Sequence, residues 1–434
     1  MKINSHRLIL FIHLFAASEA DSKWFPSEPS TLLQQILKTP PKSLSPSLPD
    51  PRPQLLVEWN RILQNTHGPW RFSSSNSQYT LSPTYSQVLP VPAVISDTVL
   101  HHAAQFRIRQ RFPLLTYVTP QPSGTALLRS SQPLVGLTQR RCIQDEKLIE
   151  AYKNAAQAPL SPPTSSKQSL LIVDARPSSS ALANTMIGAG VERLECYAHS
   201  ERIYLSLDNI HAVRDAHLKV SRSLKSQNWL EAELQSGWLE QIQKILEGTR
   251  RIAQALQESH VLVHCSDGWD RTTQLVSLVQ LCWDPFYRTQ SGFRTLLLKD
   301  WLSAGHRFAD RNYCHLQNQE ACPIFLQFIE ATVQLCRQYP LHFAEISDEF
   351  LLAVVDEVQA GRSSFFGNCE ADRLSKLESP ISVEIDGHLP LNLSKVTPLT
   401  GSVESKQADL LLPHSERAKM ILWPAYYKRY ETNK

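Results

Sequence analysis

The sequence predicts an α/β fold in which a central mixed sheet is flanked by helices, with further strands and helices around it. Short apolar runs bounded by proline or aspartate are typical of buried strands, and two of them lie at Phe112–Val118 and Leu170–Val173. From Trp238 onward apolar residues recur at helical spacing as far as Leu256, which predicts an amphipathic helix. Strands that alternate with such helices indicate this fold class.

Length and charge exclude several classes of protein. The chain has 434 residues, 42% of them hydrophobic, which is enough for a large core. Its 44 basic and 41 acidic side chains leave a net charge of +3, so a nucleic-acid binder is not expected. No apolar run reaches the roughly 20 residues that a transmembrane helix needs.

The composition divides the chain into two parts. Residues 39–54 are rich in proline and serine and are predicted to form a linker. We therefore expect residues 1–53 to be an N-terminal segment compatible with disorder, and residues 54–430 to form one continuous domain. Within that domain, the polar and proline-rich stretch Ala158–Ser169 is predicted to be a surface loop.

The N-terminus and the cysteines point to different compartments. Lys2 and Arg7 precede an apolar stretch, Leu8–Ala17, in the outline of a secretory signal; the alternative is a short hydrophobic helix or the remnant of an upstream domain. The eight cysteines contain no C-x-x-C pair, which favours reduced, buried thiols in a cytosolic protein. We expect a cytoplasmic protein, with secretion as the alternative.

One segment combines the strand and helix patterns around a cysteine. Residues 259–272 read SHVLVHCSDGWDRT, in which Val261–Val263 suits a buried strand and the apolar residues of Leu275–Cys282 share one helical face. The loop between them holds Cys265 and Arg271, six positions apart, with Gly268 between them. Two other cysteines precede an arginine by six residues, but neither pair encloses a glycine; they are Cys196/Arg202 and Cys282/Arg288.

This arrangement favours chemistry on a phosphate group. Unpaired amides at a helix start, aided by the helix dipole, gather around an anion, and the same field stabilises a thiolate at Cys265. Arg271 has the planar fork that grips two phosphoryl oxygens. Gly268 is expected to let the backbone approach the phosphate without a Cβ in the way. Thr272 is expected to donate its hydroxyl to the sulfur when a phosphocysteine is hydrolysed.

The presence of two aspartates, Asp267 and Asp270, in an anion-binding loop requires an explanation, because their negative charge repels a phosphate. We predict that Asp270, beside Arg271, is held protonated and acts as the general acid, and that Asp267 caps backbone amides; each residue has the other role as its alternative. His264 and His306 are expected to be structural. Neither histidine spacing nor clustered carboxylates suggest a metal site, and thiolate chemistry requires no cofactor.

The run CSDGWDRT resembles the active-site signature of the myotubularin lipid phosphatases, a branch of the cysteine-dependent phosphatase superfamily. The resemblance extends from about Gln54 to about Tyr430. It includes the segments SSQPLVG (130–136), IVDARP (172–177), LDNIHAVR (207–214), DPFYRTQSGFRTLLLKDWLSAGHRF (284–308), CPIFLQFIEA (322–331), FFGNCEADR (365–373) and ILWPAYYKRY (421–430).

The resemblance implies a fold and a reaction. The fold would be like that of protein tyrosine phosphatases with myotubularin-type additions. The reaction would remove the 3-phosphate from phosphatidylinositol 3-phosphate or its 3,5-bisphosphate, with Cys265 as nucleophile, Arg271 binding the phosphate and Asp270 as the suggested acid. The loop wrapping the scissile phosphate would be Ser266, Asp267, Gly268, Trp269 and Asp270.

The resemblance also implies a headgroup pocket. Asn184, Asn209 and Ile210 match positions that line the inositol pocket. Arg307 and Arg311 match a pair that contacts the 5-phosphate. Four residues apart on a helix, these two arginines would share one face, which without the family match would more often be a solvated basic face.

Partners and location follow from the same resemblance. The chain is expected to act on phosphoinositide headgroups at endosomal or other phosphoinositide-bearing membranes, to associate with a myotubularin-type partner protein, and to lack the upstream membrane-binding module of the pleckstrin-homology type. Two other functions remain open: an inactive lipid-binding or adaptor relative, and a protein tyrosine phosphatase, whose loop chemistry is the same.

Overall fold

The computed structural model describes residues 52–66, 68–157, 169–223, 229–312, 319–361, 367–378 and 410–427. The predicted signal-like segment, most of the predicted linker, the loop at 158–168 and residues 428–430 lie outside these ranges. The first described helix begins at Arg52, so residues 52–54, predicted to belong to the linker, are helical instead.

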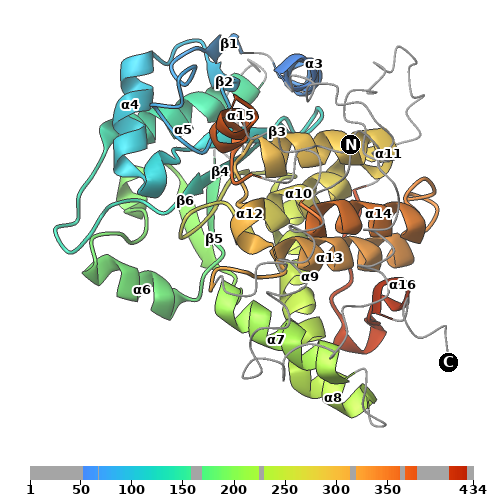
Figure 1. Ribbon diagram of the computed structural model, residues 1–434. Coiled ribbons are helices and arrows are strands. Elements are labelled where there is room, and N and C mark those ends of the chain that lie inside the picture. Colours follow the sequence, from blue (N-terminus) through green and yellow to red (C-terminus); the bar gives the residue numbers. More distant parts are fainter. Residues whose placement is uncertain are drawn as a thin grey trace.

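A five-stranded mixed sheet lies at the centre of the domain, in the order β3-β4-β7-β5-β6 (Figure 1). Strands β4, β7, β5 and β6 run parallel to one another, and β3 pairs antiparallel with β4 at one edge. A separate hairpin joins β1 and β2. The bounds are β1 Trp70–Ser73, β2 Leu89–Pro92, β3 Leu114–Val118, β4 Ala126–Ser131, β5 Leu170–Asp174, β6 Ser200–Tyr204 and β7 His260–Cys265.

Helices cover both faces of this sheet. Helices α9 and α10 pack on one face against β7, and α5 packs on the other against β4, with α4 beside it (Figure 1). The α-helices are α3 Arg52–Leu63, α4 Asp97–Phe106, α5 Ile143–Ala156, α6 Ser178–Met186, α7 Ile210–Ser223, α8 Trp229–Ser236, α9 Trp238–Ala255, α10 Arg271–Trp283, α11 Gln290–Leu296, α12 Phe308–Arg311, α13 Ile324–Gln338, α14 Asp348–Gln359, α15 Glu370–Glu378 and α16 Pro424–Tyr427. Short 3₁₀ segments lie at Ile108–Gln110, Leu194–Cys196, Pro285–Arg288 and Arg417–Lys419, and a π-helical segment at Leu297–Leu302.

The mixed α/β architecture is confirmed, and so are its predicted elements. The two predicted strands are β3 and β5, although β3 begins two residues later than the apolar run does. The predicted amphipathic helix is α9, and Leu256 follows directly after its last residue. Both β7 and α10 are almost wholly buried, because they lie between other layers of the domain. This places the end of β7 in the middle of the domain.

A second helical layer packs outside α9 and α10. Its centre is the buried carboxylate of Glu330 on α13, which accepts hydrogen bonds from Trp238 Nε1 (2.6 Å), Tyr427 Oη (3.1 Å) and the Trp423 amide (3.3 Å). These bonds join α9, α13 and the C-terminal segment. None of the helices in the described ranges has the length and apolar character required to cross a bilayer.

Candidate active site

Cys265 is the last residue of β7, and α10 begins at Arg271; we call residues 265–271 between them the Cys265 loop. The cysteine is 3% exposed, and its Sγ accepts a hydrogen bond from the Gly268 amide at 3.3 Å. Within the described chain, the amides of residues 266, 267, 269 and 270 donate to no protein acceptor. A turn of unpaired amides beside a sulfur at a helix start is suited to hold an anion.

The carbonyl groups of the loop bind to the protein beneath it. Gly268 O accepts hydrogen bonds from Arg111 Nη2 (2.9 Å) and Arg129 Nη2 (3.0 Å), both buried. Trp269 O accepts from His306 Nδ1 at 2.8 Å. Because peptide carbonyl and amide groups point in opposite directions, fixing the carbonyls below the loop leaves its amides for a ligand above it.

The packing of the Cys265 loop requires glycine at position 268. Its φ of +76° lies in the left-handed region that glycine adopts without strain. A Cβ at this position would lie 2.3 Å from the carbonyl oxygen of Ser130, the penultimate residue of β4. Glycine therefore allows the loop to pack on the end of the neighbouring strand, and its role in the approach of a phosphate stays a prediction.

Arg271 lies at the start of α10 and stays beside the loop. Its guanidinium donates to Leu207 O (3.1 Å) and to Ser266 Oγ (3.4 Å). Thr272 follows it with a buried Oγ1 that has no hydrogen-bond partner in the described ranges. Arg271 thus lies beside the loop, and directly after it the Thr272 hydroxyl has no partner in the described part of the chain.

The two aspartates of the loop differ from their predicted roles. Asp270 is buried and paired with Arg311 (Nη2–Oδ2, 2.8 Å) and His306 (Nδ1–Oδ1, 3.3 Å). Burial alone would raise the pKa of Asp270, but these partners hold it well below its usual range, so the carboxylate is ionised. This contradicts the prediction that Asp270 is kept protonated as the acid. Its side chain does not cap α10 either.

Asp267 has the opposite environment. Its side chain is 31% exposed, and its nearest cation is Arg109, with 3.7 Å between Asp267 Oδ1 and Arg109 Nε. Burial raises the pKa of Asp267 above its usual value, and Arg109 opposes that shift. The predicted capping bond from Asp267 is absent from the described residues.

The predicted pairing of Arg307 and Arg311 on one helical face is wrong. Helix α12 begins at Phe308, and Arg307 precedes it with a non-helical backbone. Arg311 is buried by Asp270 and by Glu320 (Nη1–Oε2, 2.9 Å), whereas Arg307 is 34% exposed and pairs with Asp310. A four-residue spacing places side chains together only inside a continuous helix, which is absent here.

The three predicted pocket residues lie at different distances from the loop. Asn209 is an N-cap, because its Oδ1 accepts from the His211 (3.1 Å) and Ala212 (3.0 Å) amides at the start of α7. It stands two residues from Leu207, whose carbonyl binds Arg271. Ile210 is the first residue of α7. Asn184 is half-buried on α6, and no hydrogen bond joins its side chain to the Cys265 loop in the described chain.

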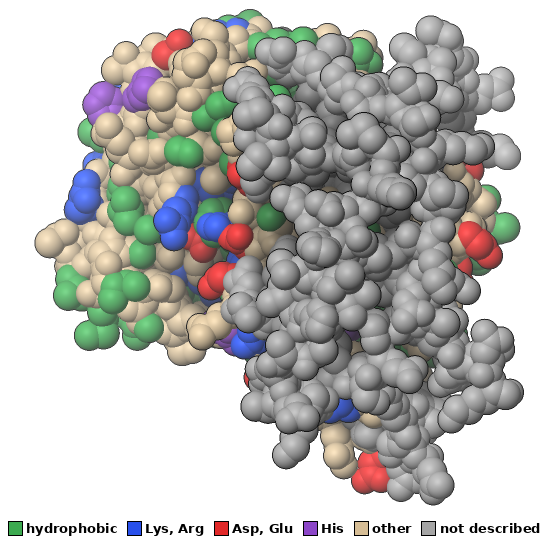
Figure 2. All heavy atoms as spheres, viewed as in Figure 1, with side chains coloured by type: hydrophobic (Ala, Val, Ile, Leu, Met, Phe, Trp, Pro, Cys, Tyr) green, Lys and Arg blue, Asp and Glu red, His purple; other side chains and the backbone are tan. Residues whose placement is uncertain are grey.

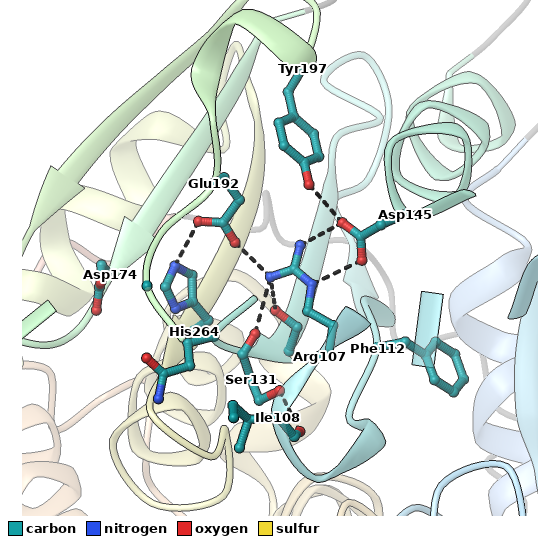
Figure 3. Close-up of polar contacts among 12 residues, drawn as sticks. Arg107, Ile108, Phe112, Ser131, Asp145, Asp174, Glu192, Tyr197 and His264 are labelled. Atoms are coloured by element: carbon teal, nitrogen blue, oxygen red, sulfur yellow. Dashed lines mark hydrogen bonds and ion pairs between the residues drawn. The ribbon is translucent and has the colours of Figure 1, made fainter. Parts of the chain in front are cut away.

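A fully buried ionic cluster includes His264, the residue before Cys265 in β7 (Figure 3). Arg107 pairs with Asp145 (2.6 Å) and Glu192 (2.6 Å), and Glu192 contacts His264 Nε2 at 3.1 Å. Burial opposes ionisation of Glu192, but the adjacent His264 and Arg107 hold the pKa of its carboxyl far below its usual range. As predicted, His264 also contacts backbone, with 3.2 Å between Nδ1 and Cys265 O.

Sequence reasoning missed the arginines around the loop. Arg107, Arg109 and Arg111 alternate in the run FRIRQRF before β3, and Arg129 lies within β4. The three arginines at alternate positions are visible in the sequence, but residues 108–110 form a 3₁₀ segment with positive φ at Arg109 and Gln110, so the three side chains do not share one side. Arg107 and Arg111 are buried, while Arg109 is 63% exposed.

Comparison with known proteins bears directly on this geometry. The Myotubularin-like phosphatase domain matches residues 51–374. The chain is 35% identical over 375 residues to phosphatidylinositol-3,5-bisphosphate 3-phosphatase MTMR2 of Pongo abelii, covering 83% of the chain and 56% of the relative. It is 35% identical over 374 residues to myotubularin of Rattus norvegicus, covering 83% of the chain and 60% of the relative.

The chain belongs to the myotubularin family. Its central mixed sheet and its cysteine loop at the end of β7 agree with the protein-tyrosine-phosphatase-like fold that the resemblance implies. The chain spans 56–60% of the length of these myotubularin relatives. In this family member, the described residues hold no group of three or more side chains suited to a metal ion.

Proposed function

We propose that this myotubularin-family chain is a phosphoinositide 3-phosphatase that removes the 3-phosphate of phosphatidylinositol 3-phosphate and of phosphatidylinositol 3,5-bisphosphate through a phosphocysteine intermediate. The observation that carries the proposal is the sulfur of Cys265 at the Gly268 amide, surrounded by loop amides that have no acceptor among the described residues. Such a site both stabilises a thiolate and binds the phosphate that the thiolate attacks.

The first step transfers the phosphoryl group to sulfur. Cys265 Sγ attacks phosphorus, the bond between phosphorus and the inositol oxygen breaks, and that oxygen takes a proton from an acid. Arg271 turns from the Leu207 carbonyl to hold two phosphoryl oxygens, and the loop amides receive the developing negative charge. In the second step water attacks phosphorus, the P–S bond breaks, and Thr272 Oγ1 donates a hydrogen bond to the departing sulfur.

Asp267 is the acid in this proposal, in place of Asp270. Two carboxyls whose environments push their pKa values apart divide the acid and ionised roles between them. Asp267 is the one that burial shifts toward the protonated form, and it lies partly exposed at the mouth of the loop. Asp270 stays ionised between Arg311 and His306, where it holds these residues under the loop. After the first step, the Asp267 carboxylate takes the proton of the attacking water.

The substrate assignment rests on what the relatives are and on where the pocket residues lie. One relative carries the name phosphatidylinositol-3,5-bisphosphate 3-phosphatase. Asn209 and Ile210, beside the Leu207 carbonyl that holds Arg271, are proposed to line the inositol ring, together with Asn184. A chain with this activity would act at cytoplasmic, phosphoinositide-bearing membranes, with a myotubularin-type protein as a partner.

The test compares phosphate release from short-chain phosphatidylinositol 3-phosphate by wild-type protein and by Cys265→Ser under reducing conditions. Wild type should release phosphate and Cys265→Ser should release none. Cys196→Ser is the matched control, because Cys196 also precedes an arginine by six residues but lies in a 3₁₀ segment away from the loop; it should keep full activity. Equal release by wild type and Cys265→Ser would refute the proposal.

The same proteins separate the other functions. Faster turnover of a phosphotyrosine peptide than of the lipid would identify a protein tyrosine phosphatase. Binding of the lipid headgroup without phosphate release by the wild-type chain would identify an adaptor.

A further inference from the structure

The π-helical segment at Leu297–Leu302 continues directly from α11 and changes the helical hydrogen-bond pattern. Its bonds span five residues, as in the bond of 2.9 Å from the Ser303 amide to Leu298 O. Single π turns within helices are rare and are found most often at functional sites. The contacts of this segment therefore bear on what it does for the Cys265 loop.

The change of helical geometry frees a backbone carbonyl for an arginine of the central sheet. In an α-helix the amide of residue 304 would donate to Asp300 O, but no backbone amide in the described chain does so. Arg129 of β4 takes that place, because its Nη1 donates to Asp300 O at 2.8 Å and to Asp300 Oδ1 at 3.3 Å. The segment thus holds the arginine through both its main chain and a side chain.

Asp300 shares its negative charge with a second cation, Lys299. Lys299 Nζ lies 2.5 Å from Asp300 Oδ2. The same Nζ donates to Thr116 O and to Gln280 Oε1, each at 2.8 Å. Burial alone would raise the pKa of Asp300, but Lys299 and Arg129 hold it below its usual value, so the carboxylate is ionised. One carboxylate therefore balances two cations, which leaves positive charge on the side of Arg129.

These charges lie inside the protein. Figure 2 shows other basic side chains, with acidic ones beside them, near the middle of one face, between the places of α6 and α12 in Figure 1. By contrast, Arg129, Lys299 and Asp300 are 1%, 3% and 1% exposed. Buried ions are retained only where protein partners replace their lost hydration, so this network is fixed as part of the fold.

The other side of Arg129 holds the two peptide groups that flank Trp269. Its Nη2 donates to Gly268 O at 3.0 Å and to Thr273 Oγ1 at 2.6 Å. The Thr273 hydroxyl donates in turn to Trp269 O at 3.0 Å. Because the amide of a peptide group points away from its carbonyl, these bonds turn the amides of Trp269 and Asp270 away from Arg129. Neither amide has an acceptor among the described residues.

Arg111 supports the same carbonyl from the turn that follows the π segment. Its Nη2 donates to Gly268 O at 2.9 Å and to Ala304 O at 2.8 Å. Two guanidinium groups on one carbonyl oxygen polarise that peptide group, and a polarised peptide has a stronger donor at its amide. The amide of this peptide group belongs to Trp269, so the effect falls on the loop.

We propose that Arg129 is a positioning residue of the phosphatase reaction, and that the π segment holds it so that the amides of Trp269 and Asp270 receive the charge that develops on the transferred phosphoryl group. The inference rests on the proposed function, because it assumes that this group lies in the Cys265 loop. Amides that are fixed in advance stabilise the transition state without reorganisation, so they contribute more to kcat than to substrate binding. Arg129 acts through Gly268 and Thr273 and does not itself contact the substrate.

The experiment compares wild type with Arg129→Met in two measurements. The first is turnover of short-chain phosphatidylinositol 3-phosphate, and the second is calorimetric titration with orthovanadate, which mimics the five-coordinate phosphorus of the transition state. Arg129→Met should lower kcat by about 10²-fold, change KM by about 3-fold or less and raise the Kd of vanadate by about 10²-fold. Arg129→Lys keeps the charge without the planar fork, so its kcat should lie between the two.

Thr273→Val is the second variant, and it tests the inference without placing a new side chain on β4. It removes the hydroxyl that joins Arg129 to Trp269 O and leaves the bond of Arg129 to Gly268 O in place. Its kcat should fall by about 10-fold, again with KM nearly unchanged.

Arg288→Met is the matched control. Arg288 is also a buried arginine that donates to two carbonyl groups, Leu281 O (2.8 Å) and Cys282 O (2.7 Å), but these lie near the other end of α10. This variant should lose stability in denaturant and keep kcat and the Kd of vanadate within about 2-fold.

Unchanged kcat and vanadate affinity in both Arg129→Met and Thr273→Val would overturn the inference. So would equal losses in Arg288→Met, or a change in KM alone. The vanadate titration needs no turnover, so it decides this inference separately from the proposed function, which fails if the wild-type protein releases no phosphate.

Discussion

The two sides of the Cys265 loop carry arginines that differ in burial and in partners. Beneath the loop, Arg111 and Arg129 are fully buried and donate to its carbonyl groups, and Arg107 is enclosed by carboxylates. At the entrance to the loop, Arg109 and Arg307 are partly exposed; Arg109 lies 3.7 Å from the Asp267 carboxylate, and Arg307 pairs with Asp310. Buried arginines therefore set the shape of the loop, whereas the exposed ones are held by fewer partners among the described residues.

This difference has a physical cause. A buried cation needs several partners to replace its lost hydration, so its bonds are fixed before any ligand arrives. Burial lowers the pKa of Arg111 to about 10, although it remains charged at neutral pH. An exposed arginine is still hydrated, so it exchanges water for phosphate oxygens at small cost.

The largest expected effect is on stability, from Arg107 compared with Arg109. Replacing Arg107 with Ala leaves Asp145 and Glu192 buried without their cation, which should lower the free energy of unfolding by about 3–5 kcal/mol. Replacing Arg109 with Ala should change it by about 0.5 kcal/mol or less. Denaturant unfolding of the two variants measures both values. Similar losses in the two would contradict the distinction between the sides of the loop.

A smaller effect, on rate, separates the two aspartates. Asp267→Asn removes the proposed acid and should lower kcat by about 10²-fold. Because the pKa of Asp267 is raised, its protonated form persists to higher pH, and wild-type kcat should fall as pH rises through that pKa. The variant should not show this fall of kcat at high pH, which we call the basic limb of the pH profile. Measuring kcat against pH with short-chain phosphatidylinositol 3-phosphate tests this.

The matched variant is Asp270→Asn, which should keep the basic limb and lose stability instead. A depressed pKa means that the Asp270 charge stabilises the fold above the carboxyl's unfolded pKa, and that this stability is lost as pH falls through the folded value. The stability difference between wild type and Asp270→Asn should therefore be present at pH 7 and disappear in acid. Loss of the basic limb in Asp270→Asn rather than in Asp267→Asn would return the acid role to Asp270.

The smallest effect shows what burial does to a carboxylate that forms no ion pair in the described part of the chain. Burial raises the pKa of Glu330 to about 7, against the hydrogen bonds from Trp238 and Tyr427. The folded protein thus holds a proton that the unfolded chain releases, so stability should fall as pH rises from about 4.5 to about 7. Glu330→Gln should be more stable than wild type by about 1–3 kcal/mol at pH 8, and the two should converge near pH 5. A constant difference across this range would contradict the assignment.

Local pattern predicts the centre of this fold well. The apolar run before Cys265, the glycine in the loop and the helix after it lie within about 25 residues, so strand, turn and helix follow from local sequence. The family resemblance additionally indicated that the fold is like that of protein tyrosine phosphatases. By contrast, the pairing of Asp270 with Arg311 joins residues 41 apart, and no periodicity encodes it.

The errors share one cause, which is that roles depend on distant partners. Asp270 was predicted to be protonated because it neighbours Arg271 in sequence, but Arg311 and His306 decide its charge. Arg307 and Arg311 were paired on a helix that begins one residue too late to hold both. The glycine was correctly singled out, yet the group that crowds it, Ser130 O, belongs to another strand.

Acid quenching of the protein during turnover of short-chain phosphatidylinositol 3-phosphate, followed by peptide mass analysis, tests whether the phosphocysteine forms. One phosphoryl group should be attached to the peptide that contains Cys265, and Cys265→Ser should yield neither this adduct nor free phosphate. Release of phosphate without any adduct on Cys265, at the same rate in Cys265→Ser, would contradict the phosphocysteine mechanism.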